Sequence, residues 1–274
     1  MSITHVIRGE EHLSNTGRQS LLYHALGADE PRFVHLGVII GPDGKKLSKR
    51  HGDAGVADFR REGYLPEALL NYLARLGWNH PAGEEEFANL EELVREWDPS
   101  RLGVSPATFD ADRLISLNAR HLRRLTAEEL RWRFEPFLEE PLPPGRELVA
   151  VEAVRQEMRV LSDGPRLLRG ITDPVDPASF AGELSGSSEE VLTHVIQGLE
   201  DRAPEGLEEA RDFVAGLRTW AKEHGVKTRD LLHPLRLALT GRDRGPGIAY
   251  LFAVLGPQET KARIERTREA RLRS

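Results

Sequence analysis

Three cations, Lys46, Lys49 and Arg50, lie close together in this chain of 274 residues. They follow a glycine-containing turn, Gly41–Gly44, which closes the short apolar run Val38–Ile40. Glycine permits backbone angles that other residues avoid, so a loop of this kind can move. Cations on a mobile loop beside a strand suit the stabilisation of negative charge on a triphosphate under attack. Taken alone, a cluster of this kind is more often an ordinary basic loop than a functional site.

The elements that must position these cations begin with a strand. The segment from Ile3 to Arg8 is rich in β-branched residues and has a period of two, and it breaks at Gly9. Residues 14–16, Ser-Asn-Thr, offer helix-capping side chains ahead of an apolar helical pattern that stops at Gly27. The sequence therefore predicts a strand, a polar loop and a helix ahead of the lysine loop.

Helical periodicity dominates the rest of the chain. Pro66 suits a first helical turn, and capping-box spacing predicts helix starts at Asn89 and Thr126. Apolar stripes at helical spacing recur between residues 192 and 255, and we assign them to the core. The sequence predicts a mainly α fold, with the last 150 residues almost wholly helical.

Charge is unevenly distributed although the net charge is only −6. Residues 32–61 hold seven Lys or Arg against three Asp, and residues 257–274 hold six against three Glu. Residues 179–210 hold eight acidic side chains against one Arg. The basic islands could face phosphates, although charge runs are more often solvated faces.

Other classes of protein are disfavoured by composition. The chain has no cysteine, which excludes disulfides and cysteine-ligated zinc and fits a reducing compartment. There is no signal-peptide pattern at the start, and no apolar run approaches the length of a membrane helix. We predict a cytoplasmic protein without a membrane partner.

The pentapeptide Lys46-Leu47-Ser48-Lys49-Arg50 resembles the second signature of class I aminoacyl-tRNA synthetases, in the form found in glutamate enzymes. Three further segments are similar to bacterial glutamyl-tRNA synthetases in the expected order: residues 6–16, 63–73 and 234–241. The resemblance implies the C-terminal remnant of a Rossmann-type catalytic domain, followed by an all-α anticodon-binding domain. We place these domains at residues 1–120 and 121–274, with a possible division of the second near residue 200.

The resemblance also implies roles for individual residues. Lys46 and Lys49 match the catalytic lysines, with Lys49 on the ATP phosphates and Leu47, Ser48 and Arg50 completing the ATP-binding loop. Arg8 matches the arginine that pairs with the bound amino acid, beside Glu11 and His12 at the adenylate pocket. ATP enters as a substrate with Mg²⁺, and no protein-bound metal is expected. For these residues the alternatives are a surface salt bridge at Arg8 and a helix-cap carboxylate at Glu11.

The implied partners are tRNA(Glu), L-glutamate and ATP, and we expect a monomer. Arg236, Arg266 and Arg268 are the candidate tRNA-binding residues, within or near the basic tail 261–273. Further candidates for phosphate contacts are Arg120, Arg123 and Arg124.

One expected element is missing from the sequence. A His-Ile-Gly-His-like signature, which opens the first half of the family's nucleotide-binding fold, is not found, and His35-Leu36-Gly37 lies in the wrong place for it. We predict that the chain alone does not activate glutamate. The abrupt start at Met1 is what a truncated gene or a split coding sequence would give. The alternatives are a non-catalytic tRNA-binding relative and a glutamine enzyme, whose β-barrel anticodon domains do not match the helical pattern here.

Overall fold

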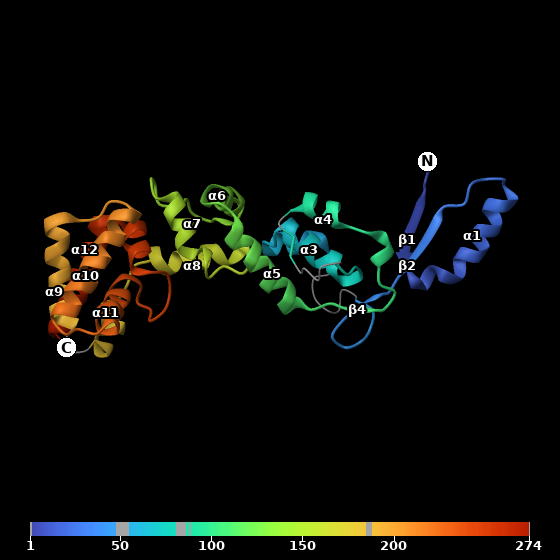
Figure 1. Cartoon of the computed structure of the whole chain (residues 1–274). Coiled ribbons are helices and arrows are strands. Elements are labelled where there is room, and N and C mark those ends of the chain that lie inside the picture. The colour runs from blue at the N-terminus through green and yellow to red at the C-terminus, as the bar shows by residue number, and fades with distance from the viewer. Residues whose placement is uncertain (1, 48–54, 81–85, 88, 185–187, 274) are drawn as a thin grey trace. The chain divides into compact units, whose positions relative to one another are not determined.

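The computed structural model describes residues 2–47, 55–80, 86–87, 89–184 and 188–273. The chain divides into two compact units, Met1–His121 and Leu122–Ser274. Helices make up most of the described residues, which confirms the predicted mainly α fold (Figure 1).

The first unit combines short strands with helices. Its elements are β1 (His5–Gly9), a 3-10 turn (Glu10–His12), α1 (Leu13–Ala25), β2 (Arg32–Leu36), β3 (Ile39–Ile40), α2 (Val56–Glu62), α3 (Pro66–Gly77), α4 (Leu90–Glu96), a 3-10 turn (Pro99–Arg101), β4 (Ala107–Thr108) and α5 (Ala111–Arg124), whose end belongs to the second unit. β1 pairs with β2 in parallel, with Arg8 opposite His35, and β3 pairs in parallel with β4. The predicted order of strand, polar loop and helix is confirmed.

The core of the first unit lies between α3 and α5. Leu69 and Tyr72 of α3 pack with Leu114 and Leu117 of α5. The buried Asn118 side chain accepts a hydrogen bond from the backbone N–H of Leu65 at 2.8 Å, which ties the start of α3 to α5. A buried amide with its acceptor satisfied fixes the relative position of two helices without leaving an unpaired polar group.

Two sequence-predicted helix starts are confirmed in detail. The Asn89 side chain accepts from the N–H of Glu92 at the start of α4, and Pro66 occupies the first turn of α3. The predicted cap of α1 is wrong. The 3-10 turn runs directly into this helix, so residues 14–16 lie inside it and the N-cap position is His12, which makes no side-chain cap bond.

The second unit contains a group of helices that share one central partner. Its elements are α6 (Ala127–Phe134), α7 (Glu147–Arg155), α8 (Gly164–Thr172), α9 (Ser188–Arg202), α10 (Leu207–Glu223), α11 (Thr228–Thr240) and α12 (Ile248–Arg273), with short 3-10 turns between α6 and α9. α12 contacts each of α7, α8, α9, α10 and α11. The capping box predicted at Thr126 is present at the start of α6.

A buried arginine joins three of these helices. Arg263 of α12 has only 2% of its surface exposed, and its guanidinium donates to the carbonyls of Ile171 at 2.9 Å and Leu239 at 2.5 Å. These carbonyls lie in the last turns of α8 and α11, where they have no partner within their own helix. A cation there also faces the negative ends of both helix dipoles.

Candidate active site and tRNA-binding surface

Arg8 lies near the end of β1 within a polar network that spans three elements. Its Nη2 donates to the Thr16 hydroxyl of α1 at 2.8 Å, and its Nε donates to Nε2 of His35 on β2 at 3.4 Å. Thr16 Oγ1 and His35 Nε2 lie 3.0 Å apart. The guanidinium also lies over the ring of Phe33, 5.2 Å from its centroid. The half-buried arginine is thus oriented by neighbours on α1 and β2.

The network includes the ring of His35, whose Nε2 faces both the Arg8 guanidinium and the Thr16 hydroxyl. The sequence analysis placed Thr16 among helix-capping side chains, whereas the structure places it inside α1, where it contacts Arg8. His35 contacts Arg8 as well. The parallel pairing of β1 with β2 brings Arg8 and His35 together.

Lys46 is held close to Glu11. Its Nζ donates to Glu11 Oε1 at 2.7 Å, and both side chains are substantially exposed. The hydrogen bond from Lys46 is the main cause that lowers the pKa of the Glu11 carboxyl, and the Glu11 backbone N–H adds to it. The pair connects the segment that follows β1 to the loop that follows β3. The carboxylate therefore positions the Lys46 ammonium near the end of β1.

Backbone hydrogen bonds hold the lysine loop between Ile39 and Leu47. The N–H of Gly41 donates to the Lys45 carbonyl at 2.7 Å, and the N–H of Leu47 donates to the Ile39 carbonyl at 2.9 Å. Gly44 has a φ of 74°, a left-handed angle that favours glycine. The predicted site residues Ser48, Lys49 and Arg50 lie outside the described residues.

His12 is exposed at the N-cap of α1, next to Glu11. Its carbonyl lies 3.5 Å from the Thr16 hydroxyl. The structure therefore brings Arg8, Glu11, His12 and Lys46 to one end of the β1–β2 pair. In the part of the chain that the structure covers, no group of three or more His, Cys, Asp or Glu side chains is placed to hold a metal ion.

The candidate tRNA-binding arginines have different surroundings. Arg236 is half-buried and donates to the Pro246 carbonyl at 2.5 Å, and burial lowers the pKa of its guanidinium. Arg266 is exposed and pairs with Glu259 at 3.2 Å. Arg268 is partly buried. Within the same basic tail, Arg263 is buried against backbone carbonyls and is therefore not available to a phosphate.

The further candidates near the start of the second unit already have partners. Arg120 forms an ion pair with Glu86, and Arg123 donates to the Gln156 carbonyl at 3.4 Å. Arg124 also has an interaction within the chain. A phosphate would have to compete with these contacts.

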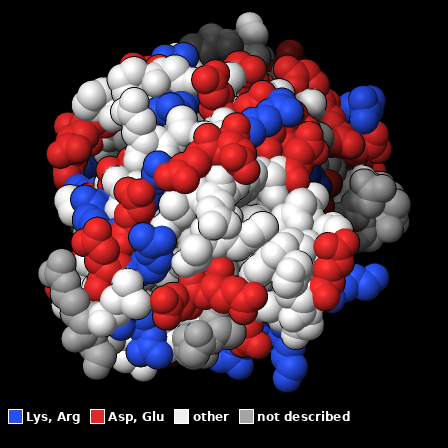
Figure 2. Space-filling model, turned by 90° about the vertical axis from the view of Figure 1, so that its left-hand side faces the viewer, with Lys and Arg blue, Asp and Glu red and all other residues white. Residues whose placement is uncertain are grey.

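Acidic side chains cover large parts of the face of the second unit seen in Figure 2, with fewer basic side chains between them. In the same unit, the first turns of α9 and α10 hold the acidic residues Glu189, Glu190, Glu208 and Glu209. A surface of this charge repels phosphates. An RNA backbone is therefore expected to avoid this face.

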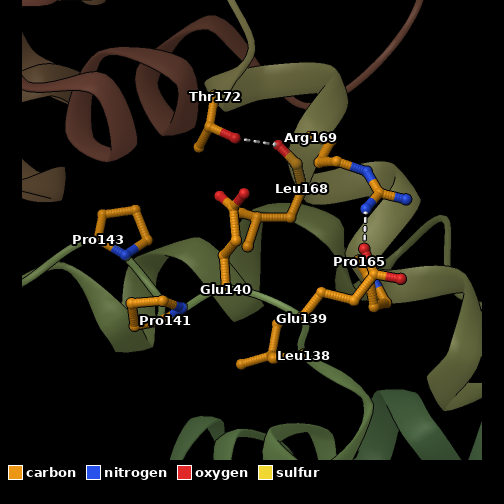
Figure 3. Close-up of a pocket in the computed structure, with 9 residues that line it drawn as sticks. All are labelled: Leu138, Glu139, Glu140, Pro141, Pro143, Pro165, Leu168, Arg169 and Thr172. Atoms are coloured by element: carbon orange, nitrogen blue, oxygen red, sulfur yellow. Dashed lines mark hydrogen bonds and ion pairs between the residues drawn. The ribbon is translucent and has the colours of Figure 1, made fainter.

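A cavity of about 200 Å³ lies in the second unit, between the loop after α6 and helix α8 (Figure 3). Its lining includes Glu139 and Arg169, which form an ion pair at 2.5 Å, and Glu140. None of the residues predicted for the site lines this cavity. We assign it no role in the chemistry.

Both units match known protein families. Residues 1–116 match the catalytic domain of class I tRNA synthetases for glutamate and glutamine, and residues 114–268 match an anticodon-binding domain. These matches place the chain among the class I aminoacyl-tRNA synthetases.

Individual relatives indicate which aminoacyl-tRNA synthetase the chain resembles. The chain is 66% identical over its full length to glutamate–tRNA ligase 1 of Rubrobacter xylanophilus, of which it covers 64%. It is 37% identical to glutamate–tRNA ligase 2 of Campylobacter curvus, with 97% of the chain and 57% of that protein covered. The structure of a glutamate–tRNA ligase from Elizabethkingia meningosepticum matches with a TM-score of 0.80 at 27% identity, covering 98% of this chain and 57% of that one. The chain belongs to the glutamate–tRNA ligase family and corresponds to a C-terminal portion of its members.

Among the described residues, every helix is too short or too polar to span a lipid bilayer. The predicted recognition of the family and its two kinds of domain is confirmed.

Proposed function

We propose that this chain serves the ATP-dependent attachment of glutamate to tRNA(Glu) through a glutamyl-adenylate, in cytoplasmic protein synthesis. The observation that supports the proposal best is the convergence of Arg8 and Lys46 on one end of the β1–β2 pair, each held by partners from other elements. The two cations match the two negative groups of the reaction, the amino-acid carboxylate and the triphosphate.

Arg8 is proposed to bind the carboxylate of glutamate. Thr16 and His35 use two of its N–H groups, and the remaining ones can form charge-assisted hydrogen bonds. Since both partners lie on regular elements, they fix the guanidinium before the substrate arrives, which lowers the entropy lost on binding. His12 and Glu11 lie beside this position.

Lys46 is proposed to stabilise the triphosphate as glutamate attacks it, together with Lys49. Glu11 holds the Lys46 ammonium at 2.7 Å. When ATP binds, Lys46 would leave Glu11 and contact the phosphates. Leu47, Ser48 and Arg50 complete the proposed ATP-binding loop, and Mg²⁺ arrives with ATP as part of the substrate. The second unit is proposed to bind tRNA through Arg236, Arg266 and Arg268, and the protein to act as a monomer.

The chain covers 64% of the Rubrobacter relative and 57% of the Campylobacter one, so we propose that it does not activate glutamate alone. Glutamate-dependent exchange of pyrophosphate into ATP, measured with the purified chain, tests this step directly. Robust exchange would show that the 274 residues suffice.

Binding of a tRNA(Glu) transcript to the same preparation tests the second unit independently. Saturable binding without exchange is the expected result. The absence of both activities would contradict the proposed function of the chain.

A further inference from the structure

Three aromatic rings stack on one another in the second unit: His194 on α9, Trp220 on α10, and His224, which follows α10 directly. We call these rings the histidine stack. The His194 and Trp220 rings are nearly parallel, at 10°, with their centroids 4.0 Å apart. The Trp220 and His224 rings meet at 28° and 4.8 Å. Aromatic pairs usually have centroids about 4.5–7 Å apart, so the contact between His194 and Trp220 is unusually close.

The two imidazoles lie on opposite faces of the indole. Both stack on Trp220, but in the described structure they make no ring contact with each other. Two imidazoles on the same face would overlap at these distances. The indole therefore separates two groups that can each gain a positive charge near neutral pH. Helices α9 and α10 both pack against α12, and the histidine stack connects them to each other directly (Figure 1).

The surroundings of His224 accommodate a positive charge. The side chain is exposed, and its Nδ1 lies 2.9 Å from the carbonyl oxygen of Trp220. The residue follows the last turn of α10, where the helix dipole favours a cation. An imidazolium over the face of an indole also gains the cation–π attraction. We therefore expect the first proton that enters the histidine stack to reside on His224.

The surroundings of His194 disfavour a second proton. Its side chain is half-buried, and this burial is the main cause that lowers the pKa of its imidazole. The charge of His224 lowers the same pKa from across the indole. Exposed Glu190, one turn earlier on α9, raises it, as the smallest of the three effects. Among the described residues, no charged group of α11 or α12, which also pack against α9, acts on His194.

We propose that the histidine stack is a pH-sensitive contact between α9 and α10, which holds while at most one imidazole is protonated and weakens when both are. The indole attracts a cation on either face, but the second cation is repelled by the first, so the two protonations are coupled. Acidification should therefore loosen the second unit at this contact. The proposal does not depend on whether the chain activates glutamate.

The sign of the pH dependence follows from the lowered pKa of His194. Above the ordinary histidine pKa of about 6.5, this side chain is neutral in both the folded and the unfolded chain. As the pH falls below that value, the unfolded chain binds the proton first, and the free energy of unfolding decreases. The decrease is complete once the pH lies below the pKa of His194 in the folded state.

An NMR titration of the histidine Cε1 protons between about pH 5 and pH 8 tests the coupling in the unmodified chain. The pKa of His194 should lie below its ordinary value, and His224→Gln should raise it, because the substitution removes the like charge. The matched control is His233→Gln. His233 lies on α11 in the same unit and outside the histidine stack, so its loss should leave the titration of His194 unchanged.

Urea denaturation at about pH 7.5 and pH 5 measures the effect on stability. His194→Phe keeps a ring in the histidine stack but cannot bind a proton. Acidification should raise the unfolding constant of the second unit about two- to fivefold more in the unmodified chain than in the phenylalanine variant. Hydrogen exchange with mass spectrometry, with the two proteins compared at the same pH, should assign the difference to α9 and α10.

Two results would overturn the proposal. One is a pKa of His194 that is ordinary, or that His224→Gln leaves unchanged. The other is an equal loss of stability on acidification in the unmodified chain and the phenylalanine variant. If His194→Phe does not fold at pH 7.5, the titrations of the unmodified chain and of His224→Gln decide the question alone.

Discussion

Replacement of Arg263 by methionine should destabilise the second unit. The arginine is 2% exposed and donates to the carbonyls of two buried residues, Ile171 at 2.9 Å and Leu239 at 2.5 Å. It also donates to Thr172 at 2.9 Å and pairs with Glu259 at 2.7 Å. Methionine occupies similar space without a donor, so the ends of α8 and α11 lose their shared partner.

The magnitude follows from these contacts. A hydrogen bond to a charged group contributes about 1.5–3 kcal/mol, so the loss at two buried carbonyls costs about 3–6 kcal/mol. Removing a buried charge recovers part of its desolvation cost, on the order of a few kcal/mol. We expect the variant to lower the free energy of unfolding by about 3 kcal/mol. For a unit of this size that corresponds to a fall of roughly 6–12 °C in Tm.

Urea denaturation followed by circular dichroism measures the change, and hydrogen exchange with mass spectrometry assigns it to the second unit. Amides in the last turns of α8 and α11 should lose protection first. The matched control is Arg266→Met, because Arg266 is 51% exposed and its ion pair with Glu259 is a surface contact worth about 0–1 kcal/mol. A methionine variant at position 263 within about 1 kcal/mol of the unmodified chain would refute the reasoning.

Three further predictions concern smaller changes. Lys46→Ala should raise the pKa of Glu11 toward its ordinary range in a ¹³C NMR titration, because Lys46 is the main cause of its lowering. A carboxyl group whose pKa is lowered by folding stabilises the folded state at pH values above its ordinary pKa. This contribution is lost as the pH falls through the pKa that the group has in the folded state. The stabilities of the unmodified chain and the alanine variant should therefore converge in acid. Gly37→Ala should destabilise the first unit by about 1–3 kcal/mol in thermal unfolding, since a Cβ would lie 2.1 Å from the Ser105 carbonyl oxygen. Thr126→Ala should cost about 1 kcal/mol in urea denaturation through the lost cap of α6.

Each of these predictions has a conservative control. Lys46→Arg should keep the pKa of Glu11 low, and an unchanged titration in the alanine variant would contradict the assigned cause. Gly216→Ala, at a helical position with no neighbour within 4 Å, should stabilise the chain by about 0.5–1 kcal/mol. Equal effects at positions 37 and 216 would contradict the steric argument. Thr126→Ser retains the capping oxygen, and a loss as large as that of the alanine variant would exclude capping as the cause.

Features that depend on neighbouring residues could be predicted from the sequence. The caps at Asn89 and Thr126 and the proline at the start of α3 involve residues a few positions apart, and the structure confirms them. The start of α1 was missed because the preceding 3-10 turn continues into the helix, which made a side-chain cap unnecessary. Local sequence patterns thus predict the presence of a helix better than they predict the structure of the segment that leads into it.

The parts of the site that join distant segments could not be predicted in the same way. The pair of Glu11 with Lys46 and the contact of Arg8 with His35 depend on which strands are neighbours and in what register. Arg263 was grouped with a basic tail because its charge was read without its burial. The sequence gives the sign of a side chain's charge, but only packing decides whether that side chain faces solvent or the backbone.

The central position of α12 has a consequence for the order of events during synthesis. Helices α7 to α11 each contact α12. Arg263 of α12 donates hydrogen bonds to Ile171 and Leu239, which lie 92 and 24 residues earlier in the chain. Contacts of such separation form late, because the intervening chain must first lose its freedom. While the ribosome is still translating α12, the emerging helices before it expose the apolar stripes that α12 will cover. We therefore expect the core of the second unit to close only after α12 has been synthesised, later than its short helix–helix connections would indicate.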